Sequence, residues 1–320
     1  MEYVRMGSTG LKVSRLCLGC MSFGSGMDWM LGEKDSRAIV KKAVEAGINF
    51  FDTADVYSRG ESESITGKAL KDFGPSRDKL VIATKVCLPM GEDPNQRGLS
   101  RKHIMHSIDD SLKRLGSDYV DLYQIHRFDY STPIEETLEA LHDVVKAGKA
   151  LHIGASTMWA WQFAKMQAAA ERLGLTRFVT MQNHYNLLYR EEEREMNPLC
   201  LDQGVGLIPW SPIAGGLLAG SREAGTVRSK SPFARDRFRR PEDQAVIDAV
   251  RKVAQARGCN PAEVAIAWLL GRPGMTAPIL GITKLAQLDD PLKALETKLS
   301  DEEIQALEAP YLTQPAIGPA

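Results

Sequence analysis

Four side chains that could transfer a proton follow three consecutive apolar runs of this sequence. Asp52 and Tyr57 follow the first run, Lys85 ends the second and His126 ends the third. Taken singly, each has an ordinary explanation, such as a helix cap, packing or a solvated amine. If the runs are neighbouring strands of a parallel barrel, their carboxyl ends meet at one rim. The spacing therefore predicts a single site containing all four groups.

The chemistry of such a site follows from the residue types. A phenol has a reference pKa of about 10 and donates a proton poorly at pH 7. We expect the ammonium of Lys85 to stabilise the phenolate of Tyr57 and lower its pKa, and Asp52 to keep that ammonium charged. Tyr57 could then protonate an alkoxide forming on a carbonyl, while His126 orients the oxygen. None of these groups supplies electrons, so a reduction would need a hydride-carrying cofactor.

The elements that position these residues alternate regularly along the chain. Strand and helix signals succeed one another without the polar alternation of half-exposed strands, which favours a parallel sheet covered by helices. The expected strands are residues 13–19, 49–51, 80–84, 119–125, 150–155, 178–181, 205–208 and 277–280. Helices are expected at 36–46, 62–73, 100–115, 133–147, 159–173, 191–202, 242–257, 261–270, 285–294 and 301–308.

These elements predict an α/β fold of the (β/α)8 TIM-barrel class. A hairpin at residues 4–13 precedes the barrel, extra helices follow it, and residues 1–320 form a single domain. A Gly-, Ser- and Arg-rich insertion is expected at 213–240. A doubly wound sheet is the alternative, but residues 19–24 (GCMSFG) lack the G-x-G-x-x-G turn expected after its first strand.

Charge and cysteine content limit the possible partners and location. The 40 Lys and Arg residues balance 41 Asp and Glu residues, which argues against nucleic acid as a partner. The sequence has neither a long apolar run nor a signal-peptide core, so no membrane association is expected. Five cysteines in a long chain favour a cytoplasmic location, with Cys17 and Cys20 buried rather than redox-active. The oligomeric state is not predicted.

Two further clusters of polar residues have ordinary explanations. His103 and His106 lie three residues apart on an expected helix, but no acidic or cysteine partner is evident. A solvated helix face is the favoured interpretation, and no metal site is predicted. The charged run at residues 190–195 (REEERE) is expected to be an exposed helix start.

Several segments resemble the aldo-keto reductase family over essentially the whole length of the chain. The residues that could transfer a proton lie in FDTADVY (51–57), ATK (83–85) and DLYQIH (121–126), which match family segments in order and context. The chain is similar, more narrowly, to the branch of YajO-like reductases. The segments that suggest this branch are RGLSRKHI (97–104), MQNHYNLL (181–188), WSP (210–212) and LEAPY (307–311).

The resemblance implies NADPH as cofactor and a small-molecule carbonyl as substrate. Ser156 and Gln182 would hold the nicotinamide amide, and Trp210 would stack on its ring. The predicted pyrophosphate contacts are Ser211, Pro212, Ala214, Gly216 and Leu217. Those around the adenosine are Gly281, Thr283, Lys284, Gln287 and Asp290, with Lys284 nearest the 2′-phosphate.

Three residues depart from the family pattern. Thr157 stands where many members carry Asn beside the nicotinamide, and Gly215 where this branch often has Arg. Pro291 replaces an Asn that often binds adenine, and proline has no side-chain donor. Weaker cofactor binding is expected at these positions.

Two other functions compete with carbonyl reduction. Lys85 could act as a Schiff-base nucleophile in an aldolase-like barrel. The chain could also be a catalytically weak NADPH-binding sensor or regulatory subunit of the same fold. Substrate specificity is expected from loops and the C-terminal tail. The residues expected to give them an apolar mouth are Met27, Trp29, Met30, Phe128 and Trp159.

Overall fold

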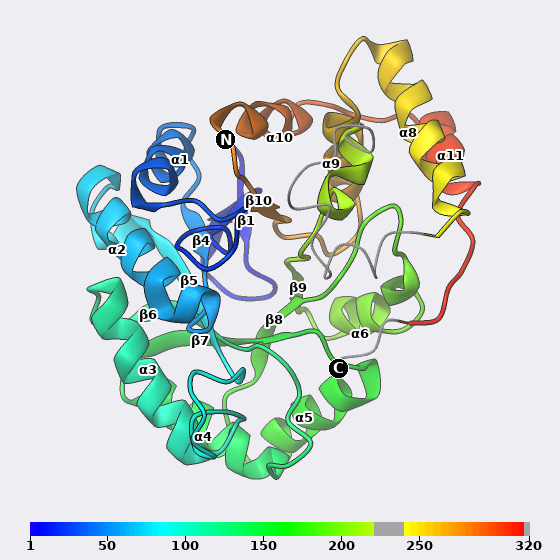
Figure 1. Cartoon of the computed structure of the whole chain (residues 1–320). Coiled ribbons are helices and arrows are strands. Elements are labelled where there is room, and N and C mark those ends of the chain that lie inside the picture. Colours follow the sequence, from blue (N-terminus) through cyan, green and yellow to red (C-terminus); the bar gives the residue numbers. More distant parts are fainter. Residues whose placement is uncertain (221–239, 317–320) are drawn as a thin grey trace.

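Eight parallel strands form the centre of the molecule. The computed structural model describes residues 1–220 and 240–316 (Figure 1). The sheet has the order β10-β3-β4-β5-β6-β7-β8-β9, with every ladder parallel. The strands are β3 (Cys17–Gly19), β4 (Phe50–Asp52), β5 (Val81–Val86), β6 (Val120–Ile125), β7 (Ala150–Ser156), β8 (Phe178–Gln182), β9 (Gly206–Leu207) and β10 (Ile279–Gly281).

Backbone hydrogen bonds join the two ends of this sheet. Ile279 N donates to Pro209 O at 2.9 Å, and Thr276 N donates to Leu207 O at 2.9 Å. The segment around β10 therefore lies beside β9, as a closed barrel requires. The predicted (β/α)8 class is confirmed, and a doubly wound sheet would leave these two edges apart.

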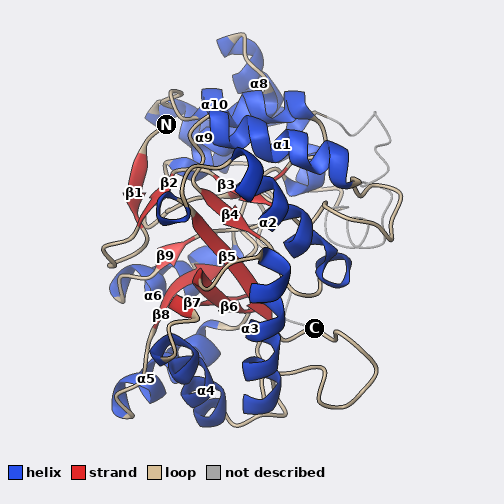
Figure 2. Cartoon of the chain, turned by 90° about the vertical axis from the view of Figure 1, so that its left-hand side faces the viewer, coloured by secondary structure: helices blue, strands red, loops and turns tan. Residues whose placement is uncertain are grey.

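Helices surround the strands on the outside (Figures 1 and 2). Their boundaries are α1 (Glu33–Glu45), α2 (Glu61–Phe73), α3 (Arg101–Leu115), α4 (Ile134–Lys146), α5 (Ala160–Arg172), α6 (Met196–Asp202), α8 (Asp243–Arg257), α9 (Pro261–Leu270), α10 (Asp289–Ala294) and α11 (Asp301–Glu308). Short 3-10 turns are η1 (Tyr57–Gly60), η2 (Arg77–Lys79), η3 (Glu191–Glu193), η4 (Ala214–Ala219) and η7 (Leu285–Leu288). Ser100 caps α3, because its side chain accepts a hydrogen bond from His103 N.

The expected N-terminal hairpin is present, but the strand predicted at residues 13–19 is divided. β1 (Tyr3–Arg5) pairs antiparallel with β2 (Lys12–Ser14), and β3 then begins at Cys17. The division follows from hydrogen bonding, because Ser14 N donates to Asn49 Oδ1 and Ser14 Oγ donates to Leu16 O. The predicted insertion at 213–240 lies mostly outside the described residues.

Strand register determines which side chains share the barrel interior. Asp52 of β4 pairs with Ala83 of β5. Lys85 lies two residues after Ala83 on β5 and pairs with Gln124 of β6. Since alternate residues of a strand share a face, Asp52 and Lys85 point to the same side. Gly154 makes room for the neighbouring side chains of Thr180 and Gln124, because a Cβ there would lie 2.3 Å from Thr180 Oγ1 and 3.0 Å from Gln124 Cγ.

No described helix is both long and apolar enough to cross a membrane.

The buried positions of the cysteines agree with the expectation for Cys17 and Cys20, both fully buried as free thiols. Burial raises the pKa of the Cys20 thiol to about 12. A thiol held neutral in this way is a poor redox group.

Candidate active site

The four predicted proton-transfer residues meet at the carboxyl ends of β4, β5 and β6. Lys85 Nζ lies 2.6 Å from Asp52 Oδ2, 2.7 Å from Thr53 O and 3.2 Å from Tyr57 Oη. The rings of Tyr57 and His126 meet edge to face, with centroids 5.7 Å apart. One ammonium therefore joins the carboxylate to the phenol, and the imidazole borders the phenol.

Two glutamines complete the support of Asp52. Gln124 Nε2 donates to Asp52 Oδ1 at 2.8 Å, and Gln182 Nε2 donates to the same oxygen at 3.0 Å. Gln182 Nε2 also donates to Gln124 Oε1 at 3.0 Å. Each oxygen of the buried carboxylate thus has a partner, as a dry ion pair requires. Gln124 was not predicted from the sequence, although it lies near the end of β6, two residues before His126.

Burial decides the protonation states of the site. Burial opposes the charge on Lys85, but Asp52 and Tyr57 outweigh it and the pKa of Lys85 is raised. Burial also raises the pKa of Tyr57, against the opposing effect of Lys85. The expected net lowering of the Tyr57 pKa is therefore wrong. The result is a charged ammonium that donates to a neutral phenol.

His126 is held neutral. Burial, followed by the charges of Lys85 and Arg127, lowers the pKa of His126 well below its ordinary value. Within the described part of the chain, Nδ1 is buried without a hydrogen-bond partner. A buried N–H without an acceptor is costly, so the proton belongs on Nε2, and this neutral imidazole can donate one hydrogen bond to a substrate oxygen.

The predicted nicotinamide residues lie at the next strand ends. Ser156 ends β7, Gln182 ends β8, and Trp210 follows β9 and is half-buried. Ser156 Oγ donates to Gln182 O at 2.9 Å. Both amide hydrogens of Gln182 are used toward Asp52 and Gln124, so this side chain can meet a carboxamide only as an acceptor, through Oε1.

Aromatic stacking and one hydrogen bond position Trp210. His184 stacks on Trp210 with centroids 4.2 Å apart and planes within 10°, and Tyr189 stacks on His184 at 4.5 Å. Trp210 Nε1 donates to Thr157 Oγ1 at 3.1 Å. Thr157, noted as a departure from the family pattern, thus contacts the indole. His184 was not predicted as a site residue, and no signal in the sequence distinguishes it from an ordinary packed residue.

The predicted pyrophosphate residues lie in one tight loop after β9. Ser211 has φ 56, Ala214 φ 49, Gly215 φ 64 and Gly216 φ 101. Successive residues of positive φ bend the backbone into a concave turn of the kind that binds anions. Pro212 is buried and Leu217 half-buried in the same loop. This turn is compatible with a pyrophosphate.

The predicted adenosine residues cluster after β10. Gln287 Oε1 accepts from Thr283 N at 2.8 Å and from Lys284 N at 3.0 Å, and Lys284 is exposed. Asp290 Oδ1 accepts from Asn260 Nδ2 at 2.7 Å, Gly281 ends β10, and Pro291 is buried. Together with the ring stack and the turn after β9, these residues fit a dinucleotide lying across the barrel mouth.

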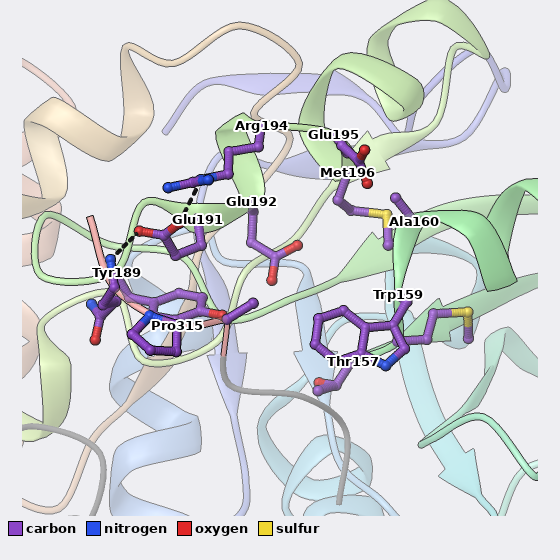
Figure 3. A pocket seen from close by; sticks show the side chains of 13 residues that line it. Thr157, Trp159, Ala160, Tyr189, Glu191, Glu192, Arg194, Glu195, Met196 and Pro315 are labelled. Carbon is purple, nitrogen blue, oxygen red and sulfur yellow. Dashed lines mark hydrogen bonds and ion pairs between the residues drawn. The ribbon is translucent and has the colours of Figure 1, made fainter.

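A cavity of about 780 Å³ opens beside the nicotinamide residues (Figure 3). Thr157, Trp159, Tyr189 and Glu192 contribute to its lining, and Gln314 and Pro315 of the C-terminal tail border it. Four residues of the run at 190–195 line this wall, namely Glu191, Glu192, Arg194 and Glu195. The run is not the exposed helix start that was expected, because Glu191 is buried.

No group of three or more metal-ligating side chains occurs within residues 1–220 and 240–316. His106 pairs with Asp110 at 3.3 Å on the surface of α3. His103 is buried, with Nδ1 3.3 Å from Ser107 Oγ, so the interpretation as a solvated face holds for His106 alone.

Comparison with known proteins identifies the family of this site. The aldo/keto reductase family model matches residues 15–311. The chain belongs to the aldo/keto reductase family. It is 45% identical to versiconal hemiacetal acetate reductase of Aspergillus parasiticus, covering 98% of this chain and 97% of that protein. An aldo-keto reductase of Alternaria alternata, AMT2, is 43% identical over 99% of this chain and 93% of its own.

A third relative agrees. The aldo-keto reductase dtxS3 of Metarhizium robertsii is 42% identical over 98% of this chain and 92% of its own length. Family membership and relatives named as reductases support carbonyl reduction by this aldo/keto reductase-family chain. Placement within the YajO-like branch stays a prediction.

Proposed function

We propose that this chain is an NADPH-dependent reductase of aldehydes and ketones, with Tyr57 as the general acid. The observation that carries the proposal is the single ammonium of Lys85, which contacts both Asp52 and Tyr57. A phenol that loses its proton beside this cation leaves a stabilised phenolate. His126, held neutral, orients the substrate oxygen by a hydrogen bond.

NADPH, when bound, supplies the hydride. The chain's part would be to hold it: Trp210 would stack on the nicotinamide, while Ser156 and Gln182 would accept hydrogen bonds from its carboxamide. The turn containing Ser211, Pro212, Ala214, Gly216 and Leu217 would hold the pyrophosphate. The residues that would surround the adenosine are Gly281, Thr283, Lys284, Gln287 and Asp290. We place this reductase in the YajO-like branch, as one cytoplasmic domain.

The Schiff-base alternative is disfavoured by the surroundings of Lys85. A nucleophilic lysine must be neutral. Here the pKa of Lys85 is raised, and its Nζ atom is already bonded to a carboxylate, a carbonyl and a phenol. A catalytically weak sensor would keep the same groups, so only a measurement of turnover distinguishes it from a reductase.

Tyr57→Phe tests the assignment of the acid. We expect carbonyl reduction to fall by about a hundred- to ten-thousand-fold, the usual contribution of a positioned proton donor. NADPH affinity, measured by fluorescence titration, should stay within about twofold of wild type, since the ring is kept. Activity that survives the change would remove Tyr57 from this role. Tight NADPH binding by wild type with no turnover on a broad aldehyde panel would favour the sensor.

Lys284→Ala tests the choice of NADPH over NADH. Loss of a charge-assisted contact to the 2′-phosphate should weaken NADPH roughly ten- to hundredfold and leave NADH nearly unaffected. Equal losses for both cofactors in calorimetric titrations would exclude Lys284 from the phosphate site.

A further inference from the structure

The three consecutive glutamates of η3 (Glu191–Glu193) differ in their ionic partners. Glu191 lies 2.6 Å from Arg194 and accepts hydrogen bonds from Tyr311 Oη and Gln314 N. Glu193 accepts from Arg190 Nε at 2.9 Å and pairs with its Nη2 at 2.8 Å. Within the described residues, Glu192 has no ion pair with any cation. Its carboxylate faces the cavity instead.

The surroundings of Glu192 are half-buried and aromatic. In Figure 3 its carboxylate points into the space between Pro315 and Trp159, with Thr157 beyond. Tyr189 also belongs to the lining, but it is 2% exposed and one face of its ring is stacked on His184. Burial, and then the neighbouring Glu191, raise the pKa of Glu192 to about 7. A carboxylate in such a place is stabilised by a cation that enters the cavity.

The cavity also contacts the residues that hold the predicted nicotinamide site. Thr157 accepts the hydrogen bond from Trp210 Nε1, and Tyr189 stacks on His184, which stacks on Trp210. A group bound beside Thr157 would therefore lie next to the predicted nicotinamide site. This closeness suits one arm of a substrate better than a separate regulatory ligand.

We propose that this cavity binds a positively charged ammonium group on the arm of the carbonyl substrate, through the carboxylate of Glu192 and the ring of Trp159. Carboxylates and aromatic faces are the groups that recognise organic ammonium ions in proteins. The volume of about 780 Å³ accommodates a trimethylammonium group with a linking chain. The inference rests on the proposed carbonyl reduction and specifies its substrate as a cationic aldehyde or ketone.

The test uses two aryl aldehydes of equal length, one ending in a trimethylammonium group and the other in the isosteric tert-butyl group. Measured at pH 8, wild type should prefer the cation by about tenfold in kcat/KM, as expected for a desolvated cation beside an aromatic ring. In Glu192→Gln the two aldehydes should be reduced equally well. A wild type without preference, or a preference that survives in Glu192→Gln, would overturn the proposal.

Two control variants distinguish specific contacts with Glu192 and Trp159 from a general electrostatic effect of negative charge on the cavity wall. Glu195→Gln makes the same charge change at an exposed position of the same cavity wall, so the preference should persist. An equal loss in Glu195→Gln would contradict the assignment to Glu192. Trp159→Leu keeps every charge and removes one ring, and it should lower the preference about threefold. An unchanged preference in Trp159→Leu would remove the aromatic wall from the proposal.

Binding without turnover separates failure of this proposal from failure of the reductase assignment. Benzyltrimethylammonium should bind wild type in calorimetric titrations, and bind Glu192→Gln about tenfold more weakly. If neither aldehyde is reduced but this difference is found, the ammonium site stands and the reductase assignment fails. If both aldehydes are reduced but wild type does not bind benzyltrimethylammonium, the site is wrong and the reductase assignment is untouched.

Discussion

The proton-transfer site and the neighbouring cavity each contain a carboxylate, buried in Asp52 and half-buried in Glu192, but the two carboxylates differ in their ionic partners. Asp52 is 2% exposed and has a lysine, two glutamine donors and a tightly packed barrel around it. Glu192 faces an open space and has no cation within the described residues. The first arrangement is complete within the protein, as expected of groups that must keep one geometry. The second has no counter-charge among residues 1–220 and 240–316, as expected of a surface that receives a ligand.

The largest expected effect comes from breaking the complete arrangement. Asp52→Asn leaves the buried ammonium of Lys85 without its counter-charge, and we expect a loss of about 3–5 kcal/mol in the free energy of unfolding. Urea denaturation measures this loss. Glu192→Gln serves as the contrast and should change stability by less than about 0.5 kcal/mol, or increase it. Similar losses in both variants would show that the two regions do not differ in this way.

Asp55 sharpens the comparison, because it is as deeply buried as Asp52 but makes no ion pair with a lysine of the described residues. It is fully buried, and within the described residues its Oδ2 atom has no partner. Burial, and then Glu63, raise its pKa to about 8. A raised pKa in the folded state means that its stabilising contribution is complete below the unfolded value near 4 and is lost as pH rises through about 8.

Asp55→Asn should therefore stabilise the protein at high pH. We expect a gain of about 1–3 kcal/mol above pH 8, since an unpaired buried charge is removed, and little change near pH 4. Urea unfolding at a series of pH values measures both. A stability difference between variant and wild type that does not vary with pH would contradict the raised pKa of Asp55.

The smallest expected effect concerns the stack behind Trp210. His184→Ala should raise the KM for NADPH about threefold to tenfold, because a stacked ring pair contributes about 0.5–1.5 kcal/mol. His184→Phe keeps a ring and should retain most of the affinity. Binding of 2′,5′-ADP, which lacks the nicotinamide, should be unchanged in both variants. A parallel loss of 2′,5′-ADP affinity would indicate general damage rather than a misplaced indole.

Much of the fold and of the candidate site could be predicted from the sequence. Asp52, Tyr57, Lys85 and His126 were identifiable because each follows an apolar run, and strand ends of a barrel share one rim. The alternation of runs and helices predicted the barrel itself. The family segments located Ser156, Gln182 and Trp210 at further strand ends, where the structure places them, and their contacts with NADPH stay predictions.

Other features depend on which side chains the folded chain brings together. Gln124 reaches Asp52 only because strand register aligns β5 with β6, and His184 reaches Trp210 because two loops meet. The pKa of Tyr57 is raised rather than lowered, because burial outweighs the effect of Lys85. The sequence identified this cation but could not predict how deeply the phenol is buried. The sequence by itself determined the order of strands, helices and proton-transfer groups. Only the tertiary structure decided which charges are paired and dry and which face a cavity, because burial and pairing depend on distances between residues far apart in the chain.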